Sequence, residues 1–339
     1  MIFKDKSFVL TQYGFKPVED LTLTEGYELA YLKDNEIKYT KDFEIVESIP
    51  DEYTKISTTK FTNIIFDNLG LYDNGNIDLK SLVEANKTLG LIKSGDFTDC
   101  GINTQPYTIE YLKNNLKIKI AIKLEDLLTL IILFNKYGSI TNDFVVLRIH
   151  NEDIFKETVK FFKNISNYNG QNDLMPYVSY KENYISMNSE DLRKIFIKRD
   201  VFLQYIFKDL DKKSTFEALL KSFIVIKDEI LNIFTFVDLN LTSALFISAL
   251  AIYNNFKVKL RIIRDGSKIC VKLVEGNKER IKPKQITFGK NSRKSLFYGV
   301  QLKDEGGYII TANQVGKYLG ITIVSNYKEN IIQLDDILS

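Results

Sequence analysis

The stretch LEDLLTLIILFNKYGSI (124–140), followed by DFVVLRIH (143–150) and EDIFKETVKFFKNI (152–165), indicates a helix, a strand and a second helix. The same order of elements returns further along the chain, in STFEALLKSF (214–223), IVIKDEILNIFTFV (224–237) and LTSALFISALAIY (241–253). An internal duplication of this size predicts a pseudo-twofold unit in which the first helices of the two halves pack together.

The sequence on both sides of this duplication has a different texture. Residues 1–106 contain short strand-like runs divided by turn residues, and similar runs return after Gly276, as in LFYGVQL and GITIVSNY. A strand-rich region that stops, gives way to a mixed helix and strand region and then resumes is typical of an insertion. We therefore expect a mixed α/β fold with a strand-rich part from residues 1–106 and 276–339 and an inserted α+β domain from residues 107–275.

Bulk composition limits the class of protein. The chain has 339 residues, of which 45% are hydrophobic and 27% charged, values typical of folded domains. Its two cysteines, Cys100 and Cys270, have no partner at metal-ligand or redox spacing, which favours a reducing compartment. The longest apolar stretch, Leu241 to Tyr253, is too short to span a bilayer. We expect a soluble protein without a membrane anchor, located in the cytoplasm or in a phage virion.

The charge of the chain is unevenly distributed. The formal net charge is only +2, but residues 257–294 contain thirteen Lys and Arg against three Asp and Glu, a net +10, so the remainder carries about −8. Within this window Lys257, Lys259 and Arg261 alternate with apolar residues, as on a strand with one cationic and one apolar face. Asp265-Gly266 is a typical hairpin turn, which predicts a two-stranded basic ribbon.

The basic ribbon is the candidate binding surface. Clustered Lys and Arg displace counterions from phosphates and give salt-sensitive affinity for nucleic acid. The opposing interpretation is a solvated strand face, on which Lys also prevents edge-to-edge aggregation. The candidate nucleic-acid-binding residues are Lys257, Lys259, Arg261, Arg264, Lys268, Lys272, Lys282 and Lys284.

Several segments resemble a known family. SFVLTQYGFKPVEDL (7–21) is similar to the opening of inteins and related Hint domains, YTKISTTKFTNIIF (53–66) resembles their second conserved block, and YGVQLKDEGGYIITANQVGK (298–317) resembles their closing blocks. The duplicated middle resembles a LAGLIDADG homing endonuclease. The resemblance implies a Hint-like horseshoe with an inserted LAGLIDADG-like domain, in which a sheet at the position of the basic ribbon lies along DNA.

The side chains that splicing requires are missing. The first residue should be a Cys or Ser nucleophile, but the register places Ile2 or Phe3 there. The family's Thr-x-x-His arrangement becomes Thr58 leading to Phe61, and the closing His-Asn pair and nucleophile become Val315, Gly316 and Lys317. Three separate losses predict a chain that does not splice.

The nuclease carboxylates are missing too. In the family, each central helix ends in an acid, and the two acids hold Mg²⁺ for phosphodiester cleavage. The matching positions are Asn135, Lys136 and Tyr137 in the first helix and Ser222 or Phe223 in the second. A competing register for the second helix uses VFLQYIFKDLD (201–211), which offers Asp209 or Asp211. In either register the first helix supplies no acid.

The sequence thus favours a non-enzymatic, intein-derived protein that binds double-stranded DNA through the basic ribbon. The alternatives are a structural or adaptor protein that binds a protein assembly, such as a phage virion component, and a residual LAGLIDADG endonuclease. No catalytic residue, metal ligand, cofactor or small-molecule substrate is expected. The single histidine, His150, and the GDFTDC segment around Cys100 have no neighbouring group typical of catalysis, so structural roles are expected for both.

Overall fold

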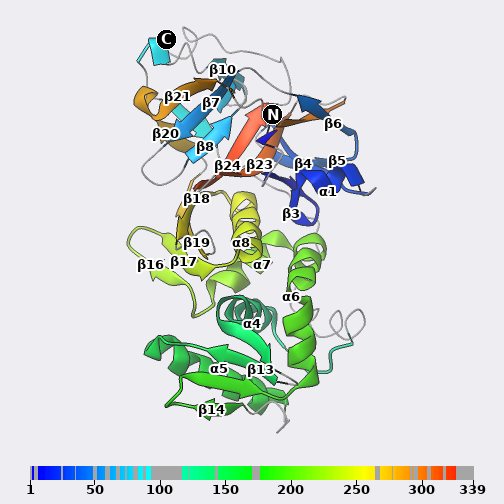
Figure 1. Ribbon diagram of the computed structural model, residues 1–339, viewed down its shortest axis with the longest axis vertical. Helices are drawn as coiled ribbons and strands as arrows, with labels where there is room; N and C mark the ends of the chain where they lie inside the picture. Colours follow the sequence, from blue (N-terminus) through cyan, green and yellow to red (C-terminus); the bar gives the residue numbers. More distant parts are fainter. Residues whose placement is uncertain are drawn as a thin grey trace.

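The fold contains both helices and sheets, as expected (Figure 1). The structure is a computed structural model. It describes residues 2–3, 7–23, 26–34, 36–48, 52–57, 62–65, 69–72, 75–78, 83–86, 89–92, 117–120, 122–141, 144–169, 176–263, 268–276, 278–290, 292, 297–303, 307–315 and 318–325. Among these residues, no helix is both long and apolar enough to cross a membrane.

The first half of the duplication is a helix, a hairpin, a helix and a second hairpin. Its elements are α4 (Leu124–Tyr137), β12 (Gly138–Thr141), β13 (Phe144–Arg148), α5 (Glu152–Asn169), β14 (Tyr177–Ser179) and β15 (Tyr184–Met187). The four antiparallel strands form one sheet in the order β12-β13-β15-β14. α4 follows from a nearly continuous apolar run, and nine of its residues are buried.

The second half repeats this topology. Its elements are α7 (Lys212–Leu220), β16 (Ile226–Asp228), β17 (Ile233–Leu239), α8 (Leu241–Tyr253), β18 (Phe256–Ile263) and β19 (Lys268–Glu275). The strands form a sheet in the order β16-β17-β19-β18, the same order as in the first half. The two first helices, α4 and α7, pack together, and Thr129 Oγ1 donates to Ser222 Oγ at 2.9 Å. The predicted duplication is therefore confirmed. The β14–β15 hairpin of the first half was not expected, whereas the β18–β19 hairpin of the second half corresponds to the predicted basic ribbon. We refer to residues 117–276 as the repeat module.

A long helix, α6 (Glu190–Asp209), joins the two halves. The segment VFLQYIFKDLD is the C-terminal half of this helix, in which Phe202, Leu203, Ile206 and Phe207 are buried at helical spacing. Asp211 is the N-cap of α7 and accepts a hydrogen bond from the Ser214 amide at 2.6 Å. Asp209 ends α6 and Asp211 precedes the first turn of α7, so neither acid lies at the end of the helix that is the repeat counterpart of α4.

Strands from both ends of the chain form the second part of the molecule, the terminal strand module. The N-terminal elements are β1 (Ile2–Phe3), β2 (Ser7–Thr11), β3 (Gly14–Pro17), α1 (Val18–Leu23), β4 (Leu29–Lys33), β5 (Glu36–Thr40), β6 (Phe43–Ser48), β7 (Glu52–Ser57), β8 (Thr62–Ile65), β9 (Leu69–Tyr72), β10 (Gly75–Asp78) and β11 (Leu89–Ile92). The C-terminal elements are β20 (Lys278–Ile281), η2 (Pro283–Gln285), β21 (Ile286–Lys290), β22 (Phe297–Leu302), β23 (Tyr308–Val315) and β24 (Tyr318–Ser325).

The two ends of the chain are interleaved in these sheets. β2 pairs with β23, β6 with β22, β7 with β21, and β11 with β20, all antiparallel. The largest sheet has the order β24-β23-β2-β4-β5, with β3 paired to β2. In Figure 1 these strands, blue and orange to red, lie together at one end of the molecule, and the green first half of the repeat module lies at the other.

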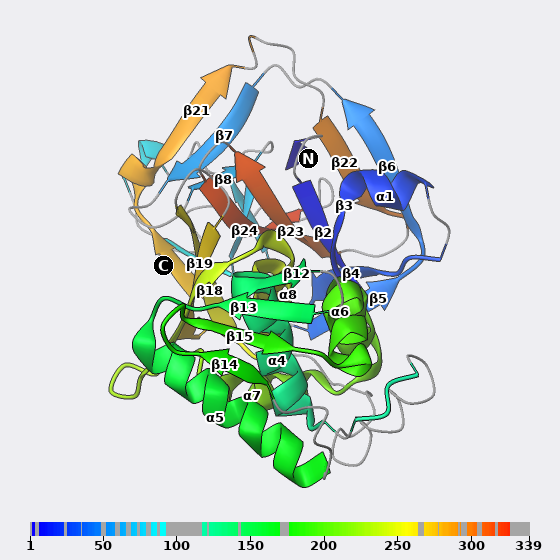
Figure 2. The ribbon, with the colours of Figure 1, turned by 60° about the horizontal axis from the view of Figure 1, so that its bottom comes forward.

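The largest sheet is buried on both faces, and one of these faces packs against the repeat module. Alternate residues on a strand point to opposite faces, so Phe8 and Leu10 join the core cluster that includes α6 and α8, whereas Val9 packs with Tyr298 and Val300 on the other face. At the junction, the Tyr39 and Tyr253 hydroxyls lie 2.6 Å apart. Figure 2 shows α6 and α8 close to β2–β5 from a second direction.

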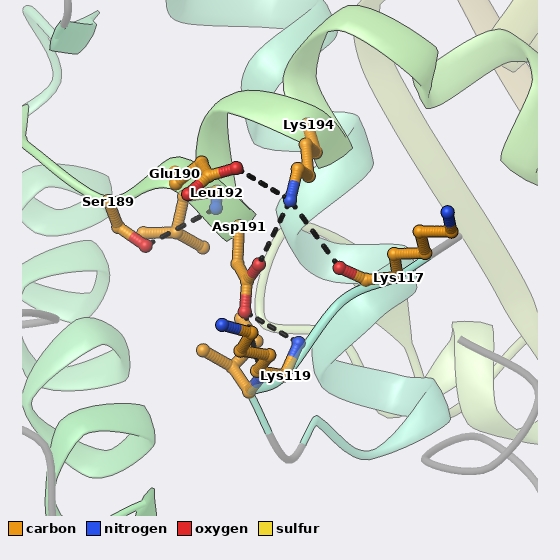
Figure 3. Close-up of polar contacts among 8 residues, drawn as sticks. Lys117, Lys119, Ser189, Glu190, Asp191, Leu192 and Lys194 are labelled. Carbon is orange, nitrogen blue, oxygen red and sulfur yellow. Dashed lines mark hydrogen bonds and ion pairs between the residues drawn. The ribbon is translucent and has the colours of Figure 1, made fainter. Parts of the chain in front are cut away.

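The start of α6 anchors the segment that enters the repeat module (Figure 3). Asp191 is only 8% exposed, and its Oδ2 accepts hydrogen bonds from the amides of Lys119 at 2.7 Å and Ile120 at 2.9 Å. Ser189 caps the helix by accepting from the Leu192 amide. A carboxylate at a helix N-terminus is further stabilised by the helix dipole. Asp191 therefore connects the start of α6 to the chain just before α4.

We expect Asp191→Ala to lower the free energy of unfolding by about 2–4 kcal/mol, because one buried and one partly buried amide lose their acceptor at about 1–3 kcal/mol each. Urea unfolding of the full chain measures the change. The matched control is Glu190→Ala, which removes an exposed side chain paired only with Lys194 at 2.8 Å and should have little effect. An equal change in the free energy of unfolding in the two variants would show that Asp191 does not stabilise the contact between the start of α6 and the chain before α4.

Candidate nucleic-acid interface

The basic residues of β18 and β19 lie on one face of the second sheet. In an antiparallel pair, directly opposite residues share a face, and Lys259 lies opposite Lys272, Arg261 opposite Cys270 and Ile263 opposite Lys268. The other face carries Leu260, Ile269, Val271 and Leu273, all buried, with α8 packed against both strands. We call the five cations on the first face the cationic face: Lys257, Lys259, Arg261, Lys268 and Lys272.

The cationic face belongs to a larger sheet than the sequence indicated. β19 also pairs with β17, and β24 of the terminal strand module packs alongside β18. The ribbon is therefore not a free two-stranded hairpin. The alternation of residues along the sequence did not reveal this, because the pairing with β17 joins segments that are distant in the chain. The adjacent strand adds Thr235, which lies opposite Lys272 on the same face.

The charges on this face are only partly balanced, because Asp238 is a neighbouring acid within electrostatic reach of Cys270. Among the described residues, no carboxylate forms an ion pair with Lys257, Arg261, Lys268 or Lys272. The direct opposition of Lys259 and Lys272 is unfavourable, because like charges across a strand pair destabilise it. An anionic partner would relieve that repulsion.

Cys270 lies in the middle of the cationic face and is half-buried. Burial raises the pKa of its thiol, Arg261 and Lys272 lower it, and the charge of Asp238 raises it, with a net result above the ordinary value. The thiol is therefore neutral at physiological pH. A nucleophilic role needs a thiolate, which this environment disfavours.

The C-terminal end of α4 extends this electrostatic region. Burial lowers the pKa of Lys136 to about 8; the nearby negative charge of Asp238 raises it and the positive charge of Lys268 lowers it further. Asp238 lies at a register shift in β17 and has a positive φ of 55°. This bulge brings a carboxylate within electrostatic reach of the end of α4. Burial and Asp238 also raise the pKa of Tyr137.

The residues at the family's metal-binding positions make structural contacts instead. Asn135 Nδ2 donates to Ser243 Oγ at 2.8 Å, and its Oδ1 accepts from Arg199 Nε, so this amide connects α4 to α8 and α6. Ser222 is buried against Thr129, six residues before Asn135, or about 9 Å along the helix axis. The two positions do not meet at one point. Among the described residues, no group of three or more His, Cys, Asp and Glu could hold a metal ion.

The remaining sequence candidates are not part of β18 or β19. Lys282 and Lys284 are exposed in and beside η2, in the terminal strand module. His150 is exposed just after β13, and Ile2 pairs with Tyr298 in an edge pairing of β1 and β22. Arg264, the Asp265-Gly266 turn, Cys100, Thr58, Phe61, Gly316 and Lys317 lie outside the described residues.

Sequence reasoning missed the solvent face of the first sheet. Phe144 and Tyr177 are 41% and 67% exposed, Arg148 is exposed, and the Tyr177 and Tyr184 rings are 6.0 Å apart. Pairing across β13, β15 and β14 places these side chains on one face. The alternation of side chains in FVVLR could have indicated this exposed face. The segment carries apolar residues on both faces of the strand, however, so its sequence did not distinguish the exposed face from the buried one. Aromatic and hydroxyl groups of this kind suit contacts to nucleic-acid sugars and phosphates.

The electrostatics at the end of α4 can be tested by titration. We expect the Lys136 ammonium to titrate at about pH 8, so the folded protein gains stability as the pH rises from about 8 to the ordinary lysine pKa, since the unfolded chain holds that proton longer. Asp238→Asn should lower this pKa and Lys268→Gln should raise it. Carbon-13 NMR of labelled lysine side chains reads the values, and an ordinary pKa at Lys136 would contradict the burial of this helix end.

Comparison with known proteins adds little to this geometry. No protein-family model and no curated protein matches the sequence. Among solved structures, the chain is similar to a crystal structure of the N-terminal LAGLIDADG domain of DUF199/WhiA. The identity is 12%, the TM-score is 0.29, and the match covers 50% of this chain and 86% of that chain. At that TM-score the similarity by itself assigns neither a fold family nor a function.

Proposed function

We propose that this protein binds double-stranded DNA through the cationic face, by electrostatic contact and without a covalent step. The observation that carries the proposal is five Lys and Arg on one sheet face, with Lys259 directly opposite Lys272. A face that only needed hydration would gain from carboxylates placed between the cations. Here the residues between them are Cys270, Ile263 and Val274.

The dimensions of the face suit a duplex. Lys257 to Arg261 spans four residues of strand, about 13 Å at roughly 3.3 Å per residue. Duplex DNA carries about one phosphate per 1.7 Å of axis, or roughly eight phosphates over that length. Since only part of these face a given side, five cations are enough to neutralise most phosphates within reach. The expected affinity is weakly specific, because phosphate contacts carry no base information.

Affinity at several salt concentrations tests the proposal. Fluorescence anisotropy with a labelled duplex of about 30 base pairs should show binding at 50 mM salt that weakens steeply toward 200 mM. Five phosphate contacts predict a slope of about −4.5 for the logarithm of the affinity against the logarithm of salt concentration. Absence of binding at 50 mM salt, or a slope near zero, would remove DNA as the partner and favour a protein assembly.

The proposed role is non-catalytic. Asn135, Lys136 and Tyr137 on α4 and Ser222 and Phe223 after α7 include no carboxylate, so a metal-dependent cleavage site of the family's type is not expected. Incubation with supercoiled plasmid and Mg²⁺ should leave the plasmid intact. Cleavage that disappears on substitution of Asp209 or Asp211 would instead support the endonuclease alternative.

The proposed origin of the chain is an intein whose reactive groups were lost. Support comes from the resemblance of residues 7–21, 53–66 and 298–317 to the Hint blocks, and from sheets that combine both ends of the chain, as a Hint-like horseshoe would. The chain inserted between two halves of a reporter protein should give no ligated reporter. A spliced product would show that another residue serves as the nucleophile.

A further inference from the structure

The free side of the first sheet carries exposed aromatic side chains. Val145 and Leu147 of β13 are fully buried, so the residues that alternate with them point to the opposite side. The pairing of β13 with β15 and of β15 with β14 extends that side over three strands, where directly opposite residues share a face (Figure 2). We call the following residues the aromatic face: Phe144, Val146, Arg148, Tyr177, Ser179, Tyr184 and Ser186.

The rings of the aromatic face are accessible. Tyr177 is 67% exposed and Phe144 is 41% exposed, and the centroids of the Tyr177 and Tyr184 rings lie 6.0 Å apart at an interplanar angle of 39°. The register places Tyr177 level with Val146, two strands away on β13, and Phe144 lies two residues before Val146. The separation of Tyr177 and Phe144 is thus about 12 Å, the length of roughly three to four stacked nucleotides.

The charge of this region is weakly positive. Arg148 is the charged residue of the aromatic face, and the turn between β14 and β15 adds the exposed Lys181 and Glu182. Glu182 lies within electrostatic reach of Tyr184. Two cations against one carboxylate leave a net charge of +1 for the face and its turn, which supports few phosphate contacts. The main property of this surface is therefore its ring area, and aromatic rings stack on the flat faces of bases of any sequence.

A duplex by itself does not offer base faces to these rings. Paired bases are stacked on one another, and extruding one of them costs the energy of unpairing and unstacking. That cost is absent for bases that are already unpaired. The aromatic face therefore fits a single-stranded segment better than a continuous duplex.

The C-terminal end of α4 lies next to both the cationic face and the aromatic face. Lys136, in the last turn of α4, is within electrostatic reach of Lys268 on the cationic face. Gly138 follows that turn and begins β12, which pairs with β13 of the aromatic face. A DNA molecule that passes this helix end can therefore contact both faces.

We propose that the aromatic face binds a short single-stranded DNA segment by stacking on its unpaired bases, next to a duplex on the cationic face. The preferred partner is then a duplex with a single-stranded extension. This inference rests on the proposed binding of duplex DNA and adds the class of DNA that is preferred. The two faces share no residue, so each is tested by its own variants.

Fluorescence anisotropy with the unmodified full chain at constant salt tests the proposal. The labelled DNAs share one duplex and carry blunt ends, an extension of about six nucleotides, or an extension of equal length made of abasic nucleotides. The extension with bases should raise the affinity at least about tenfold when placed at the 3′ or at the 5′ end. The abasic extension should raise it far less, because it adds phosphates without bases. Equal gains from the two extensions would overturn the proposal, and no gain at either end would overturn it in favour of a protein partner for this face.

A matched pair of tyrosine variants assigns the contact. Tyr177→Thr removes an exposed ring from the aromatic face and keeps a residue that suits a strand. It should lower the affinity for the extended duplex about tenfold and leave the affinity for the blunt duplex unchanged. Tyr180 is 64% exposed but lies past the end of β14, with its ring centroid 5.6 Å from that of Phe155 on α5, so Tyr180→Thr should change neither affinity. Equal losses in the two variants would refute the assignment.

Failure of this inference is distinguishable from failure of the proposed function. If the blunt duplex binds and the extension adds nothing, the cationic face is retained and the aromatic face is not a DNA site. If the blunt duplex does not bind, an oligothymidine of about twelve nucleotides still tests the aromatic face, and its affinity should be about tenfold lower for Tyr177→Thr than for Tyr180→Thr. Equal oligothymidine affinities of these two variants would overturn the inference whatever the duplex does.

Discussion

Reversing three charges on β18, with Lys257→Glu, Lys259→Glu and Arg261→Glu together, should lower the affinity for duplex DNA by about 100-fold or more at 100 mM salt. The change replaces three attractive phosphate contacts with three repulsive ones on a single strand face. The salt slope should fall by about 3, since about one unit is lost per phosphate contact. Fluorescence anisotropy measures both quantities on the folded variant.

A second triple variant separates a local contact from net charge. Lys156→Glu, Lys160→Glu and Lys163→Glu alter three exposed residues of α5 and change the total charge by the same amount. This control should keep most of the affinity, because α5 is not part of the cationic face. If the two triple variants lose affinity equally, the attraction is a general effect of net charge and the cationic face has no special role.

Gly138→Val should lower Tm by about 2–4 °C. A side chain at this position would place its Cβ 2.5 Å from the Phe134 carbonyl oxygen and 2.6 Å from Cε2 of Phe196. The backbone, with φ −83° and ψ 144°, is open to any residue, so the obstacle is space and not conformation. Overpacking of a core of this density costs about 1–3 kcal/mol or more, and about 1.4 °C of Tm per kcal/mol follows from an unfolding entropy of roughly 2.1 cal/mol/K per residue over a chain of 339 residues.

Ser139→Val is the matched control for Gly138→Val. Ser139 is the next residue of β12, is exposed, and donates only a long hydrogen bond of 3.5 Å to the Val146 carbonyl. A β-branched residue suits an edge strand, so the control should leave Tm almost unchanged. An unchanged Tm in Gly138→Val as well would mean that α4 and α6 are not packed as tightly at this end as the structure shows.

Elements with strong local periodicity were predictable from the sequence. The first helix was expected within residues 124–140, and α4 spans Leu124–Tyr137, because the apolar helical run ends at a glycine. The paired helices and the alternating face of β18 were predictable for the same reason: each depends on the period of its own side chains. The domain boundaries after residues 106 and 275 stay a prediction.

Elements that depend on distant partners were not predictable. Residues 1–106 were expected to contain short strands divided by turns, but the chain forms the helix α1 at Val18, where Pro17 precedes two acidic residues in the first helical turn. The pairing of β17 with β19 arises from contacts between segments far apart in sequence, which no local pattern encodes.

Lysine acetylation with and without duplex DNA, read by mass spectrometry, tests the proposed DNA interface most directly. Bound DNA should protect Lys257, Lys259, Lys268 and Lys272 while leaving Lys156 and Lys160 on α5 and Lys38 on β5 equally reactive. Protection centred on α5 or on the terminal strand module, or no change at a DNA concentration that saturates binding, would contradict the assignment of the cationic face.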